Sequence, residues 1–271
     1  MSWASKRKLL YLSIVLATIG LFVFIISLPA LTRAPTCFDL KQNGDEKGID
    51  CSGSCQRLCS FEVKDISVLW KRAFKVTGDR YNLLAYFENQ NASAGIKRLP
   101  YEFRFYDENN VFIGLRSGVA FIAPNSRSAI FEPGVNVGNK IPKRTSFQFL
   151  DPKPAWLKVD TAQTDKIKLE VTDKKLIDTK ITPRLEATIL NDSIFKVSDI
   201  EVIAIVYNEN QNAVAASKNF IDSLAGGAQQ NVSFTWPEPF PGDVFITEVI
   251  TRYNPFNLDL ELLRLSGTRA K

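Results

Sequence analysis

The sequence predicts a mainly β protein with one N-terminal transmembrane helix, a small disulfide-rich module and two tandem β-sandwich domains. Three observations lead to this fold class. An uncharged apolar run follows a basic flank, all four cysteines fall within 23 residues, and the remaining chain alternates apolar and polar side chains between turn-forming clusters. Alternation with a period of two indicates half-buried strands, and short strands with frequent turns are typical of sandwiches.

The apolar run at residues 9–28 predicts the transmembrane helix. None of its twenty residues is charged, and at about 1.5 Å per residue it spans about 30 Å, the thickness of a bilayer core. The flank "KRK" precedes it and only Arg33 follows nearby, so the positive-inside rule places the N-terminus in the cytoplasm and the chain after Pro29 outside. A cleaved signal peptide is the alternative, but its apolar region would usually span only about 7–15 residues.

The run "CFDLKQNGDEKGIDCSGSCQRLC" holds Cys37, Cys51, Cys55 and Cys59. Outside the cytoplasm, four closely spaced cysteines most simply form two disulfides, and so short a segment needs cross-links because it cannot build a core. Three pairings are open. A zinc site with four thiolate ligands is the alternative, although such sites usually show paired C-x2-C spacing, which this run lacks.

The same run contains a candidate calcium site. Five side chains with oxygen ligands lie around two glycines: Asp39, Asn43, Asp45, Glu46 and Asp50. Calcium binds six to eight such oxygens on a loop that glycine keeps tight. The register is not that of an EF-hand, and the alternative is a simple turn with solvated carboxylates. The run resembles the short NGDExxxDC Cys-rich modules of secreted and surface proteins, with Ser52 replacing the first glycine of the usual pair.

Two segments of about 100 residues follow, and they match each other at offsets of 102 and 101 residues. The matching apolar positions are Leu83, Ala85 and Phe87 with Leu185, Ala187 and Ile189, and Tyr101, Phe103 and Phe105 with Val202, Ala204 and Val206. An internal duplication explains this similarity. The polar residues between them, such as Glu102, Arg104, Glu186 and Thr188, are predicted to face away from the core.

The second segment, residues 184–236, carries the pattern "xAxLxNxSxxxVSDIxVxAxVYNE" and ends in "FxW". It resembles the FxLYD-type immunoglobulin-like domains of bacterial envelope proteins. The first segment carries a looser version, and the resemblance covers most of residues 65–257. It implies two immunoglobulin-like sandwiches of about seven strands outside the membrane. Because the family has no general enzymatic activity, the resemblance implies no catalytic residue.

These patterns set the predicted domain boundaries. They are a cytoplasmic tail (1–8), the transmembrane helix (9–29), the Cys-rich module (30–61), the first sandwich (62–157), a linker (158–166), the second sandwich (167–258) and a C-terminal tail (259–271). Pro152 and Pro154 are expected to stiffen the approach to the linker, because proline fixes φ.

The composition of the chain excludes several classes of function. The 271 residues include no histidine, which excludes Ser-His-Asp and Cys-His catalysis and most catalytic zinc sites. The net charge of +5 owes three charges to the "KRK" flank, and 31 basic against 29 acidic residues remain, so nucleic-acid binding is not expected. No enzyme activity and no cofactor other than calcium are predicted.

We therefore expect a single-pass cell-membrane protein, held in the bilayer by residues 9–28, with its C-terminal domains outside the cytoplasm. Its expected role is non-enzymatic binding or scaffolding at the cell envelope, with an envelope protein or a surface polymer as partner. The alternative is an accessory subunit of a membrane secretion or pilus-type assembly. The sequence does not distinguish these partners, because no site motif names a ligand.

Overall fold

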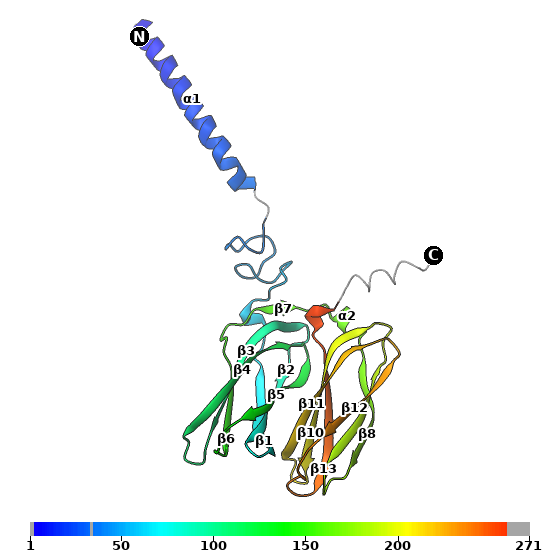
Figure 1. Ribbon diagram of the computed structural model, residues 1–271. Helices are drawn as coiled ribbons and strands as arrows, with labels where there is room; N and C mark the ends of the chain where they lie inside the picture. The colour runs from blue at the N-terminus through cyan, green and yellow to red at the C-terminus, as the bar shows by residue number, and fades with distance from the viewer. Residues whose placement is uncertain (1–2, 33–34, 259–271) are drawn as a thin grey trace, which may run out of the picture. The chain divides into compact units, whose positions relative to one another are not determined.

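The computed structural model describes residues 3–32 and 35–258 (Figure 1). Strands account for 50% of the chain and helices for 14%, which confirms a mainly β fold. The chain divides into two compact units, residues 1–55 and 56–271. The predicted C-terminal tail, residues 259–271, lies outside the described residues.

The first unit begins with helix α1 (Trp3–Thr32), which contains the predicted membrane span. Within Ser5–Leu28, an 18-residue window reaches a mean hydropathy of 2.8, and none of that window is buried. The hydroxyl groups of its serines and threonine bond within the span; for example, Ser13 Oγ donates to Leu10 O and Ser27 Oγ donates to Val23 O. A long, uncharged apolar segment whose backbone bonds internally suits a bilayer core.

After α1, the part of the first unit that the structure describes has no strand or helix. Turns and one isolated bridge, Gly48 to Cys51, organise residues 35–55. Gly53 has a φ of +61°, and a Cβ there would lie 2.2 Å from the backbone oxygen of Asp45. Two loop segments therefore approach each other at a point that only glycine accommodates.

The second unit begins with a sandwich that follows the short helix η1 (Ser60–Glu62). Its strands are β1 (Ser67–Thr77), β2 (Arg80–Asn89), β3 (Ala94–Tyr106), β4 (Phe112–Ile122), β5 (Ser126–Asn136), β6 (Arg144–Phe149) and β7 (Trp156–Lys158). One sheet has the order β1-β2-β5, and the other has the order β4-β3-β6 with β7 paired to β3. Leu83, Phe87 and Phe103 are fully buried between the two sheets.

The second sandwich repeats this arrangement. Helix α2 (Thr161–Thr164) leads into β8 (Leu169–Ile177), β9 (Arg184–Asn191), β10 (Val197–Asn208), β11 (Ala213–Leu224), β12 (Gln229–Thr235) and β13 (Val244–Arg252), and η2 (Pro255–Asn257) follows. The sheets have the orders β12-β9-β8 and β11-β10-β13. The matched sequence segments thus form the central strands, β2 with β9 and β3 with β10, which supports the duplication.

The start of the second unit differs from the predicted module boundary at residue 61. Leu58 N donates to Trp156 O at 2.9 Å, and Lys158 N donates to Gln56 O at 2.8 Å. Residues 56–58 therefore pair with β7 and extend the sheet of the first sandwich. Trp156, on β7, is 3% exposed and packs in the core of that sandwich.

The two sandwiches also share an apolar layer, which the sequence analysis did not predict. It consists of Phe74, Leu84, Ala129 and Phe131 from the first sandwich and Ile203, Ile205, Ala213 and Ala216 from the second. These residues lie on the faces of β1, β2, β5, β10 and β11 that point away from the sandwich cores. The β1-β2-β5 sheet thus packs against the β11-β10-β13 sheet, and the second unit contains four stacked sheets.

Candidate functional site

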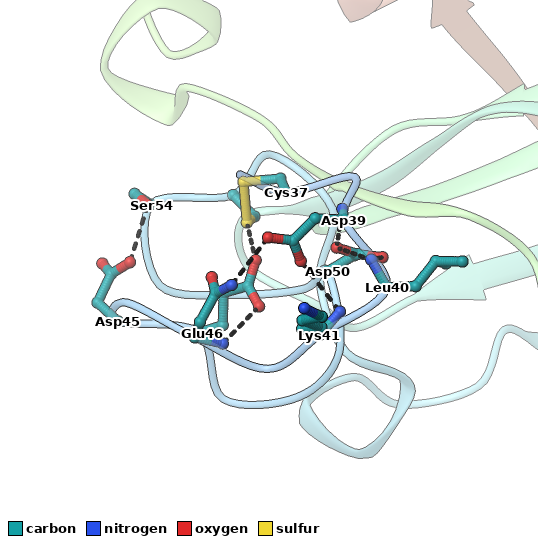
Figure 2. The surroundings of a disulfide bond; sticks show 10 residues. Cys37, Asp39, Leu40, Lys41, Asp45, Glu46, Asp50 and Ser54 are labelled. Atoms are coloured by element: carbon teal, nitrogen blue, oxygen red, sulfur yellow. Dashed lines mark hydrogen bonds between the residues drawn. A yellow bond between two sulfur atoms is a disulfide. The ribbon is translucent and has the colours of Figure 1, made fainter. Parts of the chain in front are cut away.

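The four cysteines are all disulfide-bonded, which confirms that part of the prediction. Cys37 is joined to Cys55, with 5.6 Å between their Cα atoms (Figure 2). Cys51 and Cys59 are oxidised as well. In the described residues, one cluster has metal-ligating atoms close together, and it combines Glu46 with the two sulfurs of this disulfide. Disulfide sulfurs offer no thiolate, so the zinc alternative loses its ligands.

Two of the candidate calcium ligands organise the backbone beside this disulfide. Asp50 Oδ1 accepts a hydrogen bond from Asp39 N at 3.0 Å, and Asp50 Oδ2 accepts one from Leu40 N at 3.0 Å. Asp39 in turn accepts from Lys41 N at 3.0 Å and from Asn43 Nδ2 at 2.8 Å. The hydrogen bond from Asn43 lowers the pKa of the Asp39 carboxyl group. Both carboxylates therefore act as caps for backbone N–H groups.

The other two acidic residues are bonded elsewhere in the loop (Figure 2). Asp45 Oδ1 accepts from Ser54 Oγ at 2.8 Å, and Glu46 Oε2 accepts from Asn43 N at 3.3 Å. The carboxylates do not form a cluster of their own among the described residues, whereas Asn43 Oδ1 is buried and has no hydrogen-bond partner there. The calcium site stays a prediction, and the structure shows these acids as supports of the loop.

Thiol labelling tests the cross-links directly. We expect the unreduced, denatured protein to incorporate no maleimide, because all four cysteines are oxidised, and the reduced protein to incorporate four. Intact-mass spectrometry counts the added groups. Four labels on the unreduced chain would contradict the cross-linked structure, and a Cys37→Ser variant should expose one free thiol as a positive control.

Tyrosines and a carboxylate lie across the junction of the two sandwiches. The hydroxyl groups of Tyr86 and Tyr207 donate to Glu248 Oε1 at 2.7 Å and to Glu248 Oε2 at 2.8 Å. The ring of Trp70 stacks on that of Tyr86 with centroids 5.4 Å apart. Burial, followed by the bond to Glu248, raises the pKa of both phenols. The Glu248 carboxylate thus accepts hydrogen bonds from a phenol of each sandwich, and the raised pKa keeps both phenols protonated.

This arrangement predicts a loss of stability in alkali. Unfolded tyrosine loses its proton near pH 10, whereas folded Tyr86 and Tyr207 keep theirs to higher pH. Their contribution is therefore complete below about pH 10 and is lost as the pH rises towards the folded pKa. Denaturant titrations on both sides of pH 10 should show the free energy of unfolding falling. The Tyr86→Phe/Tyr207→Phe variant should show a shallower fall, and an unchanged slope would contradict this assignment.

Arg252, at the end of β13, bridges the two sheets of the first sandwich. Its Nη1 donates to Ala129 O of β5 at 2.6 Å, and its Nη2 donates to Phe121 O of β4 at 3.2 Å. These strands belong to opposite sheets. Its charge pairs with Glu201 Oε2 at 3.0 Å, and the residue is 8% exposed. Burial lowers the pKa of the guanidinium, and Glu201 opposes that shift.

A buried acid also lies on one side of this arginine. Glu132 is 8% exposed, accepts from Tyr101 OH at 2.5 Å and pairs with Arg116 Nε at 2.8 Å. A cavity of 240 Å³ between the sandwiches is lined by Glu132, Glu201 and Arg252. The acids here are neutralised by neighbouring bases, as paired buried charges require.

A larger cavity, of 480 Å³, lies on the other side of Arg252. It is lined by parts of β4 and β5 and the turn between them, by α2 and the residue after it, and by the end of β13 and the residues after it; among these are Phe121, Ser128, Asp165 and Tyr253. Sequence analysis named none of these as site residues. Their local patterns are those of ordinary strands and turns, so nothing within a short window distinguishes them.

The apolar helix and the paired sandwiches define the class of protein, a β-sandwich protein with one candidate membrane-spanning helix. No known protein family matches the chain, and no curated protein does. The FxLYD resemblance therefore stays a prediction.

Similar solved structures include a red sea bream transglutaminase, a glycosyl hydrolase family 2 member from Bacteroides cellulosilyticus and the calcium binding domain CBD12 of CALX1.1. All three are 10% identical to this chain, with TM-scores of 0.24, 0.23 and 0.20. The alignments cover 70%, 66% and 68% of this chain. They cover 30%, 27% and 79% of the transglutaminase, the hydrolase and the calcium binding domain. At these TM-scores the likeness carries no argument about activity.

Proposed function

We propose that this protein is a single-pass, membrane-anchored, non-enzymatic binding protein that displays its paired sandwiches outside the cytoplasm at the cell envelope. The apolar layer between the sandwiches is the observation that carries the proposal. Ile203, Leu84 and Phe131 are 0%, 0% and 5% exposed in that layer. A buried apolar contact of this kind joins the domains into one body, which suits the presentation of a fixed surface.

The disulfides support the proposed side of the membrane. Disulfides form and persist in oxidising compartments outside the cytoplasm, and the cysteines directly follow the anchor in sequence. The basic flank before α1 supports the same orientation. A non-enzymatic role is supported by the buried Glu132 and the partly buried Glu201, which form hydrogen bonds and ion pairs with neighbouring residues.

Protease protection in intact cells tests the orientation. A tag fused after Lys271 should be removed by a protease added outside, whereas a tag fused before Met1 should be protected. Permeabilised cells, in which both tags should be digested, provide the control. Protection of the C-terminal tag with loss of the N-terminal one would overturn the proposed topology.

Crosslinking in native membranes, followed by mass spectrometry, tests the role. Retention on cell-wall material without a stoichiometric protein partner would support polymer binding, and a crosslinked envelope protein outside the bilayer would support protein binding. One stoichiometric complex joined through α1 would instead favour an accessory subunit of a membrane assembly. Crosslinks through α1 and through the sandwiches can be assigned separately by their peptide masses.

A further inference from the structure

The 480 Å³ cavity beside Arg252 has the size of a small-molecule site, since such pockets measure about 300–1,000 Å³. Its walls come from three parts of the second unit. Ser128 belongs to β5 of the first sandwich, Thr164 to α2, and Tyr253 directly follows β13 of the second sandwich. The cavity therefore exists only when the two sandwiches are packed together.

An unpaired hydroxyl group lines this cavity. Ser128 is 5% exposed, and its Oγ is buried without a hydrogen-bond partner in the described part of the chain. Buried polar groups are nearly always paired, and an exception needs an explanation. Its Oγ is covered from water in this structure, so a ligand with a hydroxyl group or another small polar group would supply the missing partner once the Ser128 side chain turns its Oγ towards the cavity.

The charges in the cavity favour a neutral ligand. Arg252 is compensated by Glu201, and Arg127 by Glu88 at 2.7 Å. Asp165 has no ion-pair partner among the described residues. An anion would meet this free carboxylate, and a cation would meet two guanidinium groups. A neutral molecule with several hydroxyl groups avoids both repulsions and can donate to Asp165.

The remaining lining residues suit the ring of a sugar. Aromatic and proline rings line the cavity at Phe121, Tyr253, Pro124 and Pro255, and the amide of Asn125 lies with them. The C–H face of a sugar ring packs on such apolar surfaces, while its hydroxyl groups bond to carboxylate, amide and hydroxyl side chains. Tyr253 OH donates to Thr164 O at 3.3 Å, which holds its ring beside α2.

We propose that this cavity binds a neutral saccharide unit, with Ser128 and Asp165 hydrogen-bonding to its hydroxyl groups. The inference rests on the proposed binding role and deepens it, because it selects a hydroxyl-rich surface polymer as the ligand class. The two sandwiches would hold the sugar at their junction, and the anchor would tether the protein to the membrane.

Saturation-transfer NMR on the full-length protein, in a detergent without a sugar headgroup, tests the proposal. The probes are glucose, galactose, mannose, N-acetylglucosamine and their β1,4-linked dimers at millimolar concentration. We expect at least one of them to bind, and Ser128→Ala and Asp165→Asn each to weaken its affinity about tenfold through the loss of a hydrogen bond.

Matched substitutions far from the cavity provide the controls. Ser233→Ala on β12 and Asp243→Asn in an exposed loop should leave affinity unchanged. The melting temperature of Ser128→Ala should equal or exceed that of the natural protein, because its hydroxyl group has no partner to lose. An unchanged or higher melting temperature would show that weaker binding by Ser128→Ala does not come from unfolding.

Three results would overturn the proposal. They are no saturation transfer to any probe, binding that both cavity variants leave intact, and displacement of a bound saccharide by inorganic phosphate or lysine amide, which would assign the site to an ion. The assay in micelles does not depend on membrane orientation. A negative NMR result would refute the saccharide proposal but would not contradict the proposed membrane-anchored binding role. Reversed protease protection would contradict that role, whatever the NMR result.

Discussion

Replacing Ile203 with glutamate is expected to separate the two sandwiches while leaving each sandwich core intact. Ile203 is 0% exposed in the layer between them, and an unpaired carboxylate there would cost about 3–5 kcal/mol, the range measured for an uncompensated buried charge. Limited proteolysis of the full-length protein should then cut within residues 158–166, and the radius of gyration from X-ray scattering should increase.

The duplication supplies matched controls for this variant. Position 203 corresponds to Glu102 in the first sandwich, at the offset of 101 residues. Glu102→Gln on that outward face should change stability by no more than about 0.5 kcal/mol, and Ile203→Leu by less than about 1.5 kcal/mol because it conserves volume. An unchanged radius and melting temperature for Ile203→Glu would show that the layer does not hold the sandwiches together.

Replacing Arg252 with methionine is expected to produce the other large effect. The substitution keeps the side chain long and apolar but leaves Glu201 without its closest buried partner, and the carbonyls of Ala129 and Phe121 lose their donors. Leaving carbonyl groups without donors costs about 1–3 kcal/mol each, and Glu201, which is partly exposed and keeps Lys218 Nζ at 3.3 Å, adds less. Denaturant titration measures the loss, and it should appear in the first sandwich because Arg252 bridges its two sheets.

Two further variants isolate the role of the buried charge. Arg127→Met removes an exposed arginine that pairs with Glu88, and such pairs contribute about 0–1 kcal/mol. Combining Arg252→Met with Glu201→Leu should recover little of the loss, since Glu201 is partly exposed and keeps Lys218 as a partner in the single variant. If Arg252→Met cost no more than Arg127→Met, the bridging role would be wrong.

Local periodicity predicted the strands and their inward faces well. Tyr101, Phe103 and Phe105 are 6%, 0% and 2% exposed, as the alternation with Glu102 and Arg104 requires. The turn clusters also lie between strands, and Asn110 and Asn125 hold the positive φ that asparagine tolerates. These features repeat every two residues or lie within a few residues of one another, so a short window contains them.

The duplicated segments differ at their outward-facing positions. The outward positions Leu84 and Tyr86 in the first sandwich correspond to Glu186 and Thr188 in the second, and Glu102 and Arg104 correspond to Ile203 and Ile205. In each pair, the apolar member faces the junction and the polar member lies on an outermost sheet. The polar outer faces limit the stack to two sandwiches, because a third sandwich packed on either face would bury charged side chains.

By itself, the sequence determined the apolar anchor, the oxidised cysteine run, the period-two strands and their duplication, because each depends on residues that are neighbours in the chain or on a fixed repeat. Only the tertiary structure decided which outward faces meet, that Arg252 reaches carbonyls 123 and 131 residues away, and that Ser128 and Asp165 share one cavity. Such contacts depend on how two sheets pack, and no local pattern specifies that geometry.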